Sequence, residues 1–482
     1  MKTSLLALVL TGLAAFGHAQ NPVRDSLRRT IGREVRIPDR CFAILDYKIP
    51  RTRVGLEKNL HRIARHPGLD TLLSPAEKAE VLAEINARCE ALGKDSLLTS
   101  DLFWVMRPYY DRLHHEDPHY RIDPVPFGDA QVYTTKHDRR RLSRDLRMPA
   151  FSLLQIDDTL LIDRSLDPAF RRGDRVRSIN GAAAADYLKY GYDDRHLYPT
   201  ALMNRYYYSQ AVDRFRIELE RAGDTLTVET AGQPARKAIF ALGKAEETDA
   251  NIRAYTDAGA GYIAIPRFFP DNSRLIRLVR KAIVGFRRQG LRNVVLDLRR
   301  NPGGHGHAFD ELLSIFIDKP AVEYCTGQRV KASKEAMRYY DFLTEEQSGR
   351  VVELPEGEYV RTFETKPKMY VAGMRCYVLV SRDTGSIAAS FVNMLQYHGA
   401  AQLAGEPLRH NALKYGEMLD GGLLHPTQLA ENGVAMVEID ECTRRDDGYV
   451  VPDIAIPDVA ADYLPGRDAV LERLLETIKG AP

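Results

Sequence analysis

Ser386 stands at the point where a short apolar run gives way to a helical pattern. Residues 376–380 (CYVLV) are typical of a buried strand, and apolar residues recur at helical spacing over 387–395. A serine at such a corner has the unpaired N–H groups of a helix start behind it, which is where a protein would present a nucleophile. The alternative is that its hydroxyl caps the helix. Both interpretations stay open for this stretch taken alone.

A pair of glycines follows a second apolar run. Residues 299–304 (RRNPGG) come directly after VVLDL at 294–298 and lead into another helical pattern. Consecutive glycines, Gly303 and Gly304, let the backbone approach a ligand closely and direct N–H groups at one point, as an oxyanion site requires. An ordinary glycine turn has the same sequence. The rest of the chain has to decide between these two interpretations.

Strands and helices alternate along the carboxyl-terminal half, and these elements must position both turns. The pattern predicts a strand at 261–265, a helix at 274–288, a buried strand at 294–298 and a helix at 308–317. Alternation of this kind indicates a layered α/β core whose strands are buried. We place this core at residues 246–482.

The amino-terminal half divides into two regions of different character. Residues 20–121 are mainly helical in pattern, with a helix start at Ser74, where serine, proline and glutamate take the N-cap, N1 and N3 positions. Residues 122–245 consist of short strands and turns. Within them, FRRGDRVRSING at 170–181 resembles the signature of a PDZ domain of the kind inserted in bacterial processing proteases. That resemblance implies a β-rich module that binds extended peptide termini by strand addition.

Five motifs extend the resemblance to a protein family. The region 261–458 resembles the carboxyl-terminal processing peptidases and the related tricorn-core serine peptidases. The motifs occur in the family's order: GYIAI at 261–265, DLRRNPGG at 297–304, TGS at 384–386, GEP at 405–407 and VPDI at 451–454. The resemblance implies a core similar to those of crotonase and Clp protease, with serine nucleophile chemistry on peptide bonds.

The resemblance assigns roles to both turns. Ser386 takes the position of the family's nucleophile, and the next backbone amide belongs to Ile387. The family binds the oxyanion with that amide and with one from the diglycine turn, which is Gly303 or Gly304 here. Both contributors precede predicted helices, whose dipoles favour negative charge.

The residue at the general-base position differs from that in one branch of the family. Peptidases of the serine–lysine type have Phe-Gly-Lys shortly after a Gly-Glu pair, whereas this chain reads GEPLRHN at 405–411, with Asn411 in the lysine's position. An amide has no useful basicity, and Lys414 would need a different loop. The tricorn-like branch uses a histidine from before the PDZ insertion, and the loop DPH at 117–119 resembles that segment, so we predict His119 as the base. The competing histidines are His114, His115 and His410.

The same branch orients its histidine with a carboxylate just before the Val-x-Pro-Asp segment. Here this carboxylate is Asp446 or Asp447, of which we favour Asp447, although the spacing is shifted by one position and a solvated turn explains the pair equally well. His305 and His307 lie two positions apart without further ligands nearby. We therefore predict no metal and no other cofactor.

Composition and the amino-terminal residues indicate which partners and which cellular compartment to expect. The 482 residues are 44% hydrophobic, and their net charge of +2 gives no reason to expect nucleic acid or an anionic membrane as partner. Residues 1–19 read as a secretory signal peptide, too short to span a bilayer, with Gln20 as the expected mature start. The five cysteines have no zinc spacing. Cys41 and Cys89 would be able to pair in an oxidising compartment, and free thiols explain them equally well.

Together these observations predict an exported serine endopeptidase that cleaves unfolded or carboxyl-terminal peptide segments. Its partner is a peptide or an unfolded protein, and the sequence does not give its oligomeric state. One alternative is a peptide-binding protein that keeps the protease fold without activity, which the missing lysine motivates. The other is a serine–lysine peptidase that uses Lys414.

Overall fold

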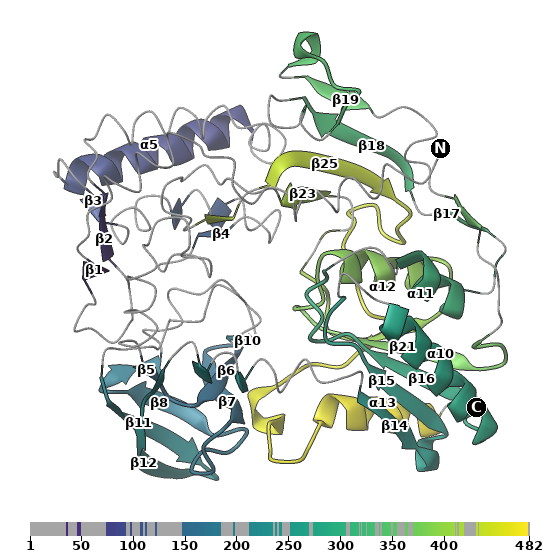
Figure 1. The fold of residues 1–482 in the computed structure, drawn as a ribbon, viewed down its shortest axis with the longest axis horizontal. Coiled ribbons are helices and arrows are strands. Elements are labelled where there is room, and N and C mark those ends of the chain that lie inside the picture. Colours follow the sequence, from purple (N-terminus) through teal and green to yellow (C-terminus); the bar gives the residue numbers. More distant parts are fainter. Residues whose placement is uncertain are drawn as a thin grey trace.

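The computed structural model describes two main regions and several shorter stretches (Figure 1). The described residues are 35–36, 46–49, 74–92, 97–98, 107–108, 111–112, 121–122, 147–184, 196–197, 212–234, 237–238, 241–242, 251–268, 273–304, 309–317, 319, 321–323, 325–332, 337, 340–348, 350–353, 362–364, 370–409, 411, 414–418, 430–431 and 433–480. The two main regions are an α/β core and a β-rich module at residues 147–234.

A six-stranded sheet forms the centre of the α/β core. Its spatial order is β14-β15-β16-β21-β22-β26, with β14 antiparallel to β15 and the later pairs parallel. The strands are β14 (Asn251–Tyr255), β15 (Ala260–Ala264), β16 (Asn293–Asp297), β21 (Arg375–Val380), β22 (Gln402–Gly405) and β26 (Ile454–Ala455). Because parallel strands end at the same edge of a sheet, the turns after β16 and β21 lie beside each other.

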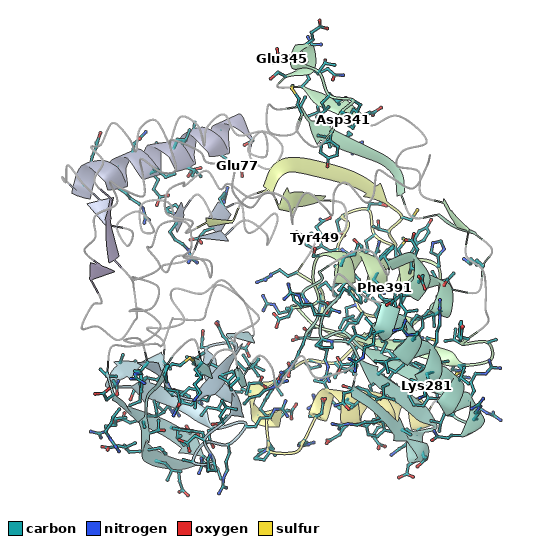
Figure 2. All side chains as sticks on the ribbon, in the orientation of Figure 1. Glu77, Lys281, Asp341, Glu345, Phe391 and Tyr449 are labelled. Carbon is teal, nitrogen blue, oxygen red and sulfur yellow. The ribbon has the colours of Figure 1, made fainter. Side chains whose placement is uncertain are left out.

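Helices cover both faces of this sheet, which explains the continuous apolar runs in its central strands. One face packs against α10 (Ser273–Arg288), α11 (Phe309–Phe316) and α12 (Ile387–Tyr397), and the other packs against α13 (Ala469–Gly480). Along β16, Val294 and Leu296 face the first layer while Val295 faces α13. Figure 2 shows Phe391 of α12 among the side chains of the first layer. The predicted α/β core is confirmed, and its predicted strands and helices are present.

The β-rich module is a seven-stranded antiparallel sheet. Its order is β10-β6-β7-β8-β11-β12, and β9 pairs with β8. The strands are β6 (Phe151–Ile156), β7 (Thr159–Ser165), β8 (Arg175–Ile179), β9 (Ala182–Ala183), β10 (His196–Leu197), β11 (Arg214–Arg221) and β12 (Asp224–Ala231). Asn180 and Gly181 both have positive φ (51° and 80°) and make the predicted tight turn after β8.

Smaller sheets complete the described part of the chain. A four-stranded sheet has the order β19-β18-β25-β23, and three further pairs are β17·β20, β13·β5 and β24·β4. Their bounds are β4 (Arg121–Ile122), β5 (Arg147–Met148), β13 (Gln233–Pro234), β17 (Ala321–Glu323), β18 (Cys325–Lys331), β19 (Val351–Glu353), β20 (Thr362–Glu364), β23 (Lys414–Met418), β24 (Ala430–Glu431) and β25 (Gly433–Glu441). The β24·β4 pair joins residues 121–122 to residues 430–431 of the carboxyl-terminal half.

The amino-terminal region contains one long described helix, α5 (Pro75–Leu92). Its start is a capping box, because the Ser74 hydroxyl accepts the Glu77 N–H at 3.3 Å and the Glu77 carboxylate accepts the Ser74 N–H at 3.0 Å. This confirms the predicted helix start. The region is not purely helical, since β1 (Val35–Arg36), β2 (Asp46–Ile49) and β3 (Leu97–Leu98) form a three-stranded sheet. No helix in the described ranges is long and apolar enough to cross a membrane.

Candidate active site

Ser386 lies between the end of β21 and the first residue of α12, at the predicted strand-to-helix corner. It occupies the N-cap position, but its hydroxyl makes no capping hydrogen bond to the helix. Its backbone has φ 51° and ψ −133°, the conformation of the first central residue of a type II′ turn, where glycine is normal. The alternative role of Ser386 as a helix cap is therefore not observed.

The strained backbone of Ser386 has to be held by its surroundings. A non-glycine residue in such a region costs on the order of 1–3 kcal/mol, and strain of this kind is concentrated at functional sites. The turn before it is fixed by Thr384, which is fully buried and donates its hydroxyl to the Leu298 carbonyl at 2.9 Å. The Ser381 hydroxyl donates to the Arg299 carbonyl at 2.5 Å. Two hydroxyls thus connect the turn before Ser386 to the strand end that carries the diglycine turn.

The diglycine turn lies directly against Ser386. A Cβ placed on Gly303 would be 2.6 Å from the Ser386 Cβ and 3.2 Å from the Ile387 amide nitrogen. Gly303 and Gly304 have φ of 105° and 129°, values that residues with a side chain rarely adopt. Glycine is therefore required at position 303 both for the conformation and for the close approach. The two turns that the sequence analysis singled out meet in space.

Asn301 organises the diglycine turn from inside. Its side chain is fully buried, donates from Nδ2 to the Ile265 carbonyl at 3.1 Å, and accepts the Gly303 N–H on Oδ1 at 2.9 Å. Its backbone carbonyl accepts the Gly385 N–H at 3.0 Å. One residue therefore joins the segment directly after β15, the diglycine turn and the turn before Ser386. The sequence analysis assigned no role to Asn301, although its place in the motif at 297–304 was a signal.

Two backbone amides of the site, those of Ile387 and Gly304, have no hydrogen-bond acceptor within the described residues. The Gly303 amide is occupied by Asn301. Gly304 is fixed by a parallel bridge to Phe268, whose ring packs edge-on against Phe391 of α12 at 6.0 Å. The same aromatic contact therefore supports both α12 and the backbone around Gly304.

Charged groups anchor the start of the diglycine turn. Arg299 binds Asp297 and also the Asp468 carboxylate, with Nη1–Oδ1 at 2.9 Å and Nη2–Oδ2 at 2.6 Å. Burial alone would lower the pKa of Arg299, but the two carboxylates outweigh it and raise the pKa. Burial works against the ionised form of Asp468, yet Arg299 brings its pKa down to about 2. Tyr262 donates to Asp297 at 2.7 Å, and burial with this carboxylate raises the tyrosine pKa.

Residues 259–417 match the model of peptidase family S41. The matched residues lie within the α/β core. This range contains the diglycine turn, Ser386 and Ile387, and the match indicates a serine-type peptidase.

Solved structures of CPAF share the fold of this chain. The structure of mature CPAF covers 88% of this chain and 95% of its own, at 14% identity and a TM-score of 0.55. CPAF complexed with lactacystin covers 88% and 97%, at 14% identity and 0.54. The photosystem II D1 C-terminal processing protease covers 88% and 96%, at 14% identity and 0.41. Among curated proteins, none matches this chain.

Asp447, the carboxylate predicted to orient the base, lies within the described residues. It lies in an exposed turn that is marked by Tyr449 in Figure 2. Its carboxylate pairs with Arg445 and accepts the Tyr449 amide at 3.1 Å. The hydrogen bonds from Arg445, and then the one from Tyr449, lower the Asp447 pKa to about 2. Asp446 is exposed in the same turn.

The candidate bases are not placed by side-chain geometry. His119, His114, His115 and His410 lie outside the described residues, and Lys414 is described only as part of the backbone of β23. The roles predicted for them, and those of Ser386 and Asp447, stay predictions. The described backbone does show that β4 begins two residues after position 119 and pairs with β24 of the carboxyl-terminal half.

Asn411, which stands where serine–lysine relatives have lysine, donates from Nδ2 to the Asp447 carbonyl at 2.8 Å. A backbone bridge joins Asn411 to Tyr449. The residue therefore fixes the turn of Asp447. Within the described residues, no cluster of three or more histidine, cysteine, aspartate or glutamate side chains could hold a metal ion.

Proposed function

We propose that this chain is an exported serine endopeptidase that cleaves unfolded or carboxyl-terminal peptide segments, with Ser386 as its nucleophile. One observation carries the proposal: a serine with strained backbone at φ 51°, whose hydroxyl does not cap its helix, packs against the diglycine turn. A nucleophile on a sharp strand-to-helix turn has its hydroxyl exposed to substrate, while the strain keeps the turn from relaxing into a normal helix start.

The oxyanion is bound, in this proposal, by the amides of Ile387 and Gly304. Gly303 is excluded as a donor because Asn301 already accepts its N–H at 2.9 Å. Its role is instead steric, since only glycine allows the two turns to approach this closely. The Ile387 amide also lies at the amino terminus of α12, where the helix dipole favours the negative charge that develops during acyl transfer.

His119 is the proposed general base. It takes the proton from the Ser386 hydroxyl as that oxygen attacks the substrate carbonyl, and returns it to the leaving amine. The pairing of β4 with β24 supports this choice, because it places the backbone just after position 119 beside residues 430–431 of the carboxyl-terminal half. Asp447 is the proposed orienting carboxylate. Its pKa of about 2 keeps it ionised at neutral pH, as stabilising an imidazolium requires.

Activity-based labelling tests the nucleophile. A fluorophosphonate probe applied to the full chain, followed by peptide mass spectrometry, should label Ser386. The variant Ser386→Ala should lose both labelling and cleavage of β-casein, used as an unfolded substrate. The matched control is Ser390→Ala, one turn further along α12, which should keep both. Labelling at another serine of the folded wild-type chain would overturn the assignment.

Three variants separate the candidate bases. His119→Ala, His410→Ala and Lys414→Ala are compared for kcat/KM over a range of pH. A histidine base gives an acid limb near pH ~6.5, whereas a lysine base places it higher. We expect His119→Ala alone to remove most of the activity. If Lys414→Ala does so instead, the serine–lysine alternative is correct.

Export and peptide capture are parts of the same proposal. Cell fractionation with sequencing of the mature terminus should find the protein outside the cytoplasm, beginning at Gln20. The β-rich module acts, in this proposal, as a PDZ-like domain that holds extended peptide termini. Its resemblance to PDZ domains at 170–181 supports this role, and a free carboxyl-terminal peptide should bind more tightly than its amidated form.

A non-catalytic peptide-binding protein is the second candidate. The observation that favours it is Asn411, which bonds the Asp447 carbonyl at 2.8 Å and supplies no base. In that case Ser386→Ala leaves peptide affinity unchanged, and the wild-type chain does not cleave β-casein. Cleavage that depends on Ser386 rules this candidate out.

A further inference from the structure

Two consecutive arginines begin the diglycine turn, and each binds a carboxylate on a different element. Arg299 binds Asp468, directly before α13. Arg300 binds Asp163 of β7, with Nη1–Oδ2 at 2.9 Å and Nη2–Oδ1 at 2.6 Å. Both pairs are bidentate, the geometry that fixes the orientation of a guanidinium most strongly. The second pair crosses from the core to the β-rich module.

Asp163 needs this partner because it is buried. Its side chain is 1% exposed, while that of Arg300 is 26% exposed. Arg172 and Arg164 are its more distant cations, at 3.7 Å and 3.9 Å. A buried carboxylate without a close counter-charge is strongly unfavourable, so Arg300 is held where both of its hydrogen bonds are satisfied. The burial of Asp163 thus fixes the residue that precedes Asn301.

The β-rich module also packs against the chain segment that leads to Asp468. Arg172 donates to the Arg467 carbonyl at 2.6 Å and lies over the Tyr463 ring, 5.0 Å from its centroid. Apolar residues of β6 and β7 pack against Ala460 and Tyr463. Figure 1 shows this segment, coloured yellow, running between the two regions. Docking of the module therefore supports both anchors of the turn, Asp163 directly and Asp468 through its preceding residues.

If the Arg300 backbone moves, the proposed oxyanion site moves with it, because only a few covalent and hydrogen bonds separate the two. The next residue, Asn301, holds the Gly303 amide and, through its carbonyl, the Gly385 amide. Gly304 follows directly. The backbone between Arg300 and Gly304 has little freedom to move. Gly303 packs closely against Ser386, and Gly304 is bridged to Phe268.

We propose that Asp163 is a positioning residue: the docked β-rich module, through the Asp163–Arg300 pair, sets the diglycine turn in the geometry that directs the Gly304 amide at the oxyanion. This inference rests on the proposed function, since the position of the turn affects catalysis only if it stabilises the oxyanion. It assigns the module a structural part in the chemical step, separate from any part in peptide capture. Loss of the pair lowers kcat and leaves KM nearly unchanged.

A closely matched ion pair in the same module provides the control. Arg221 binds the buried Asp174, with side-chain exposures of 22% and 2% and Nη2–Oδ2 at 2.5 Å. The variants are Arg300→Gln, Arg300→Lys and Arg221→Gln in the full chain. Each glutamine variant leaves a buried carboxylate without its guanidinium, so both should unfold at lower temperature. Only the Arg300 variants act on the turn.

Three measurements test the inference. On β-casein, we expect Arg300→Gln to lower kcat at least about tenfold with KM within about twofold, and Arg300→Lys to recover part of kcat because the charge is kept. Arg221→Gln should keep kcat within about twofold of the wild type. Hydrogen exchange should rise in peptides covering 299–304 in Arg300→Gln and stay unchanged there in Arg221→Gln.

Two results overturn the inference. The first is that Arg300→Gln keeps the wild-type kcat and the wild-type hydrogen exchange at 299–304. The second is that the Arg300 and Arg221 variants lose kcat equally at the same folded fraction. Failure of the proposed function is distinguished by the wild-type chain, which would then show no labelling at Ser386. In that case faster exchange at 299–304 in Arg300→Gln alone would still support the positioning of the turn by Asp163. Unchanged exchange there would refute it independently of activity.

Discussion

Substituting Gly303 by alanine tests the approach of the two turns. A Cβ at this position would lie 2.6 Å from the Ser386 Cβ and 2.8 Å from the Gly385 carbonyl oxygen. Carbon atoms in contact rest about 3.5–4.0 Å apart, so the turns have to separate by roughly 1 Å. The φ of 105° adds a conformational cost of about 1–2 kcal/mol.

The expected effect of Gly303→Ala follows from that displacement. A misplacement of about 1 Å at a reacting centre costs about 10²-fold in rate, which corresponds to ~2.7 kcal/mol of transition-state stabilisation. Overpacking adds about 1–3 kcal/mol of destabilisation to the conformational cost. We therefore expect kcat/KM on β-casein to fall about 100-fold, together with a lower urea midpoint.

Gly290→Ala is the matched control. Gly290 also has a positive φ (75°), but a Cβ there would meet nothing within 4 Å. It should lose stability through the conformational cost alone and keep kcat/KM within about twofold. The reasoning is refuted if Gly303→Ala keeps wild-type activity. It is equally refuted if Gly290→Ala, measured at the same folded fraction, loses as much activity.

Three further predictions concern stability and reactivity. Asn301→Ala leaves the Ile265 carbonyl and the Gly303 amide without buried partners, so the free energy of unfolding should fall by about 2–4 kcal/mol in urea denaturation; an unchanged midpoint would contradict the role assigned to Asn301. The Asp468 pKa is lowered from 3.8 to about 2 in the folded chain, so its contribution is complete above pH ~5 and lost as the pH falls toward 2. After discounting for solvent screening, we expect Asp468 to contribute about 1–2 kcal/mol to the free energy of unfolding. Asp468→Asn should remove this acid-dependent part of the urea midpoint, and an unaltered pH profile in the variant would contradict the prediction. Burial raises the pKa of the Cys376 thiol to about 12. Iodoacetamide at pH 8 should therefore alkylate Cys376 only after unfolding, as followed by mass spectrometry. Rapid alkylation in the folded chain would contradict the burial of Cys376.

Local sequence determined the elements of the core. The strand at 376–380, the helix after Ser386 and the capping box at Ser74 agree with β21, α12 and the start of α5. Apolar periodicity, glycine turns and capping residues act over a few positions, so they can be read from the chain directly. The amino-terminal strands β1–β3 were missed because they contain only two to four residues each.

Within the candidate site, sequence identified Ser386, Ile387 and the diglycine turn as a set but could not show that they touch. The tertiary structure decided which glycine amide is left without an acceptor among the described residues, because only folding brings the Asn301 side chain onto the Gly303 N–H. It also removed the capping interpretation of Ser386, since a φ of 51° is imposed by packing and not by residue type.

The ion pairs around the diglycine turn could not be predicted from the sequence. Asp163 and Arg300 are 137 positions apart, and neither stands in a pattern that marks the other as its partner. The sequence by itself determined the residue types that could do serine chemistry and the elements that carry them. Only the tertiary structure decided how the turns are held, because hydrogen bonds and burial between distant segments exist only after the sheet and the β-rich module have packed together.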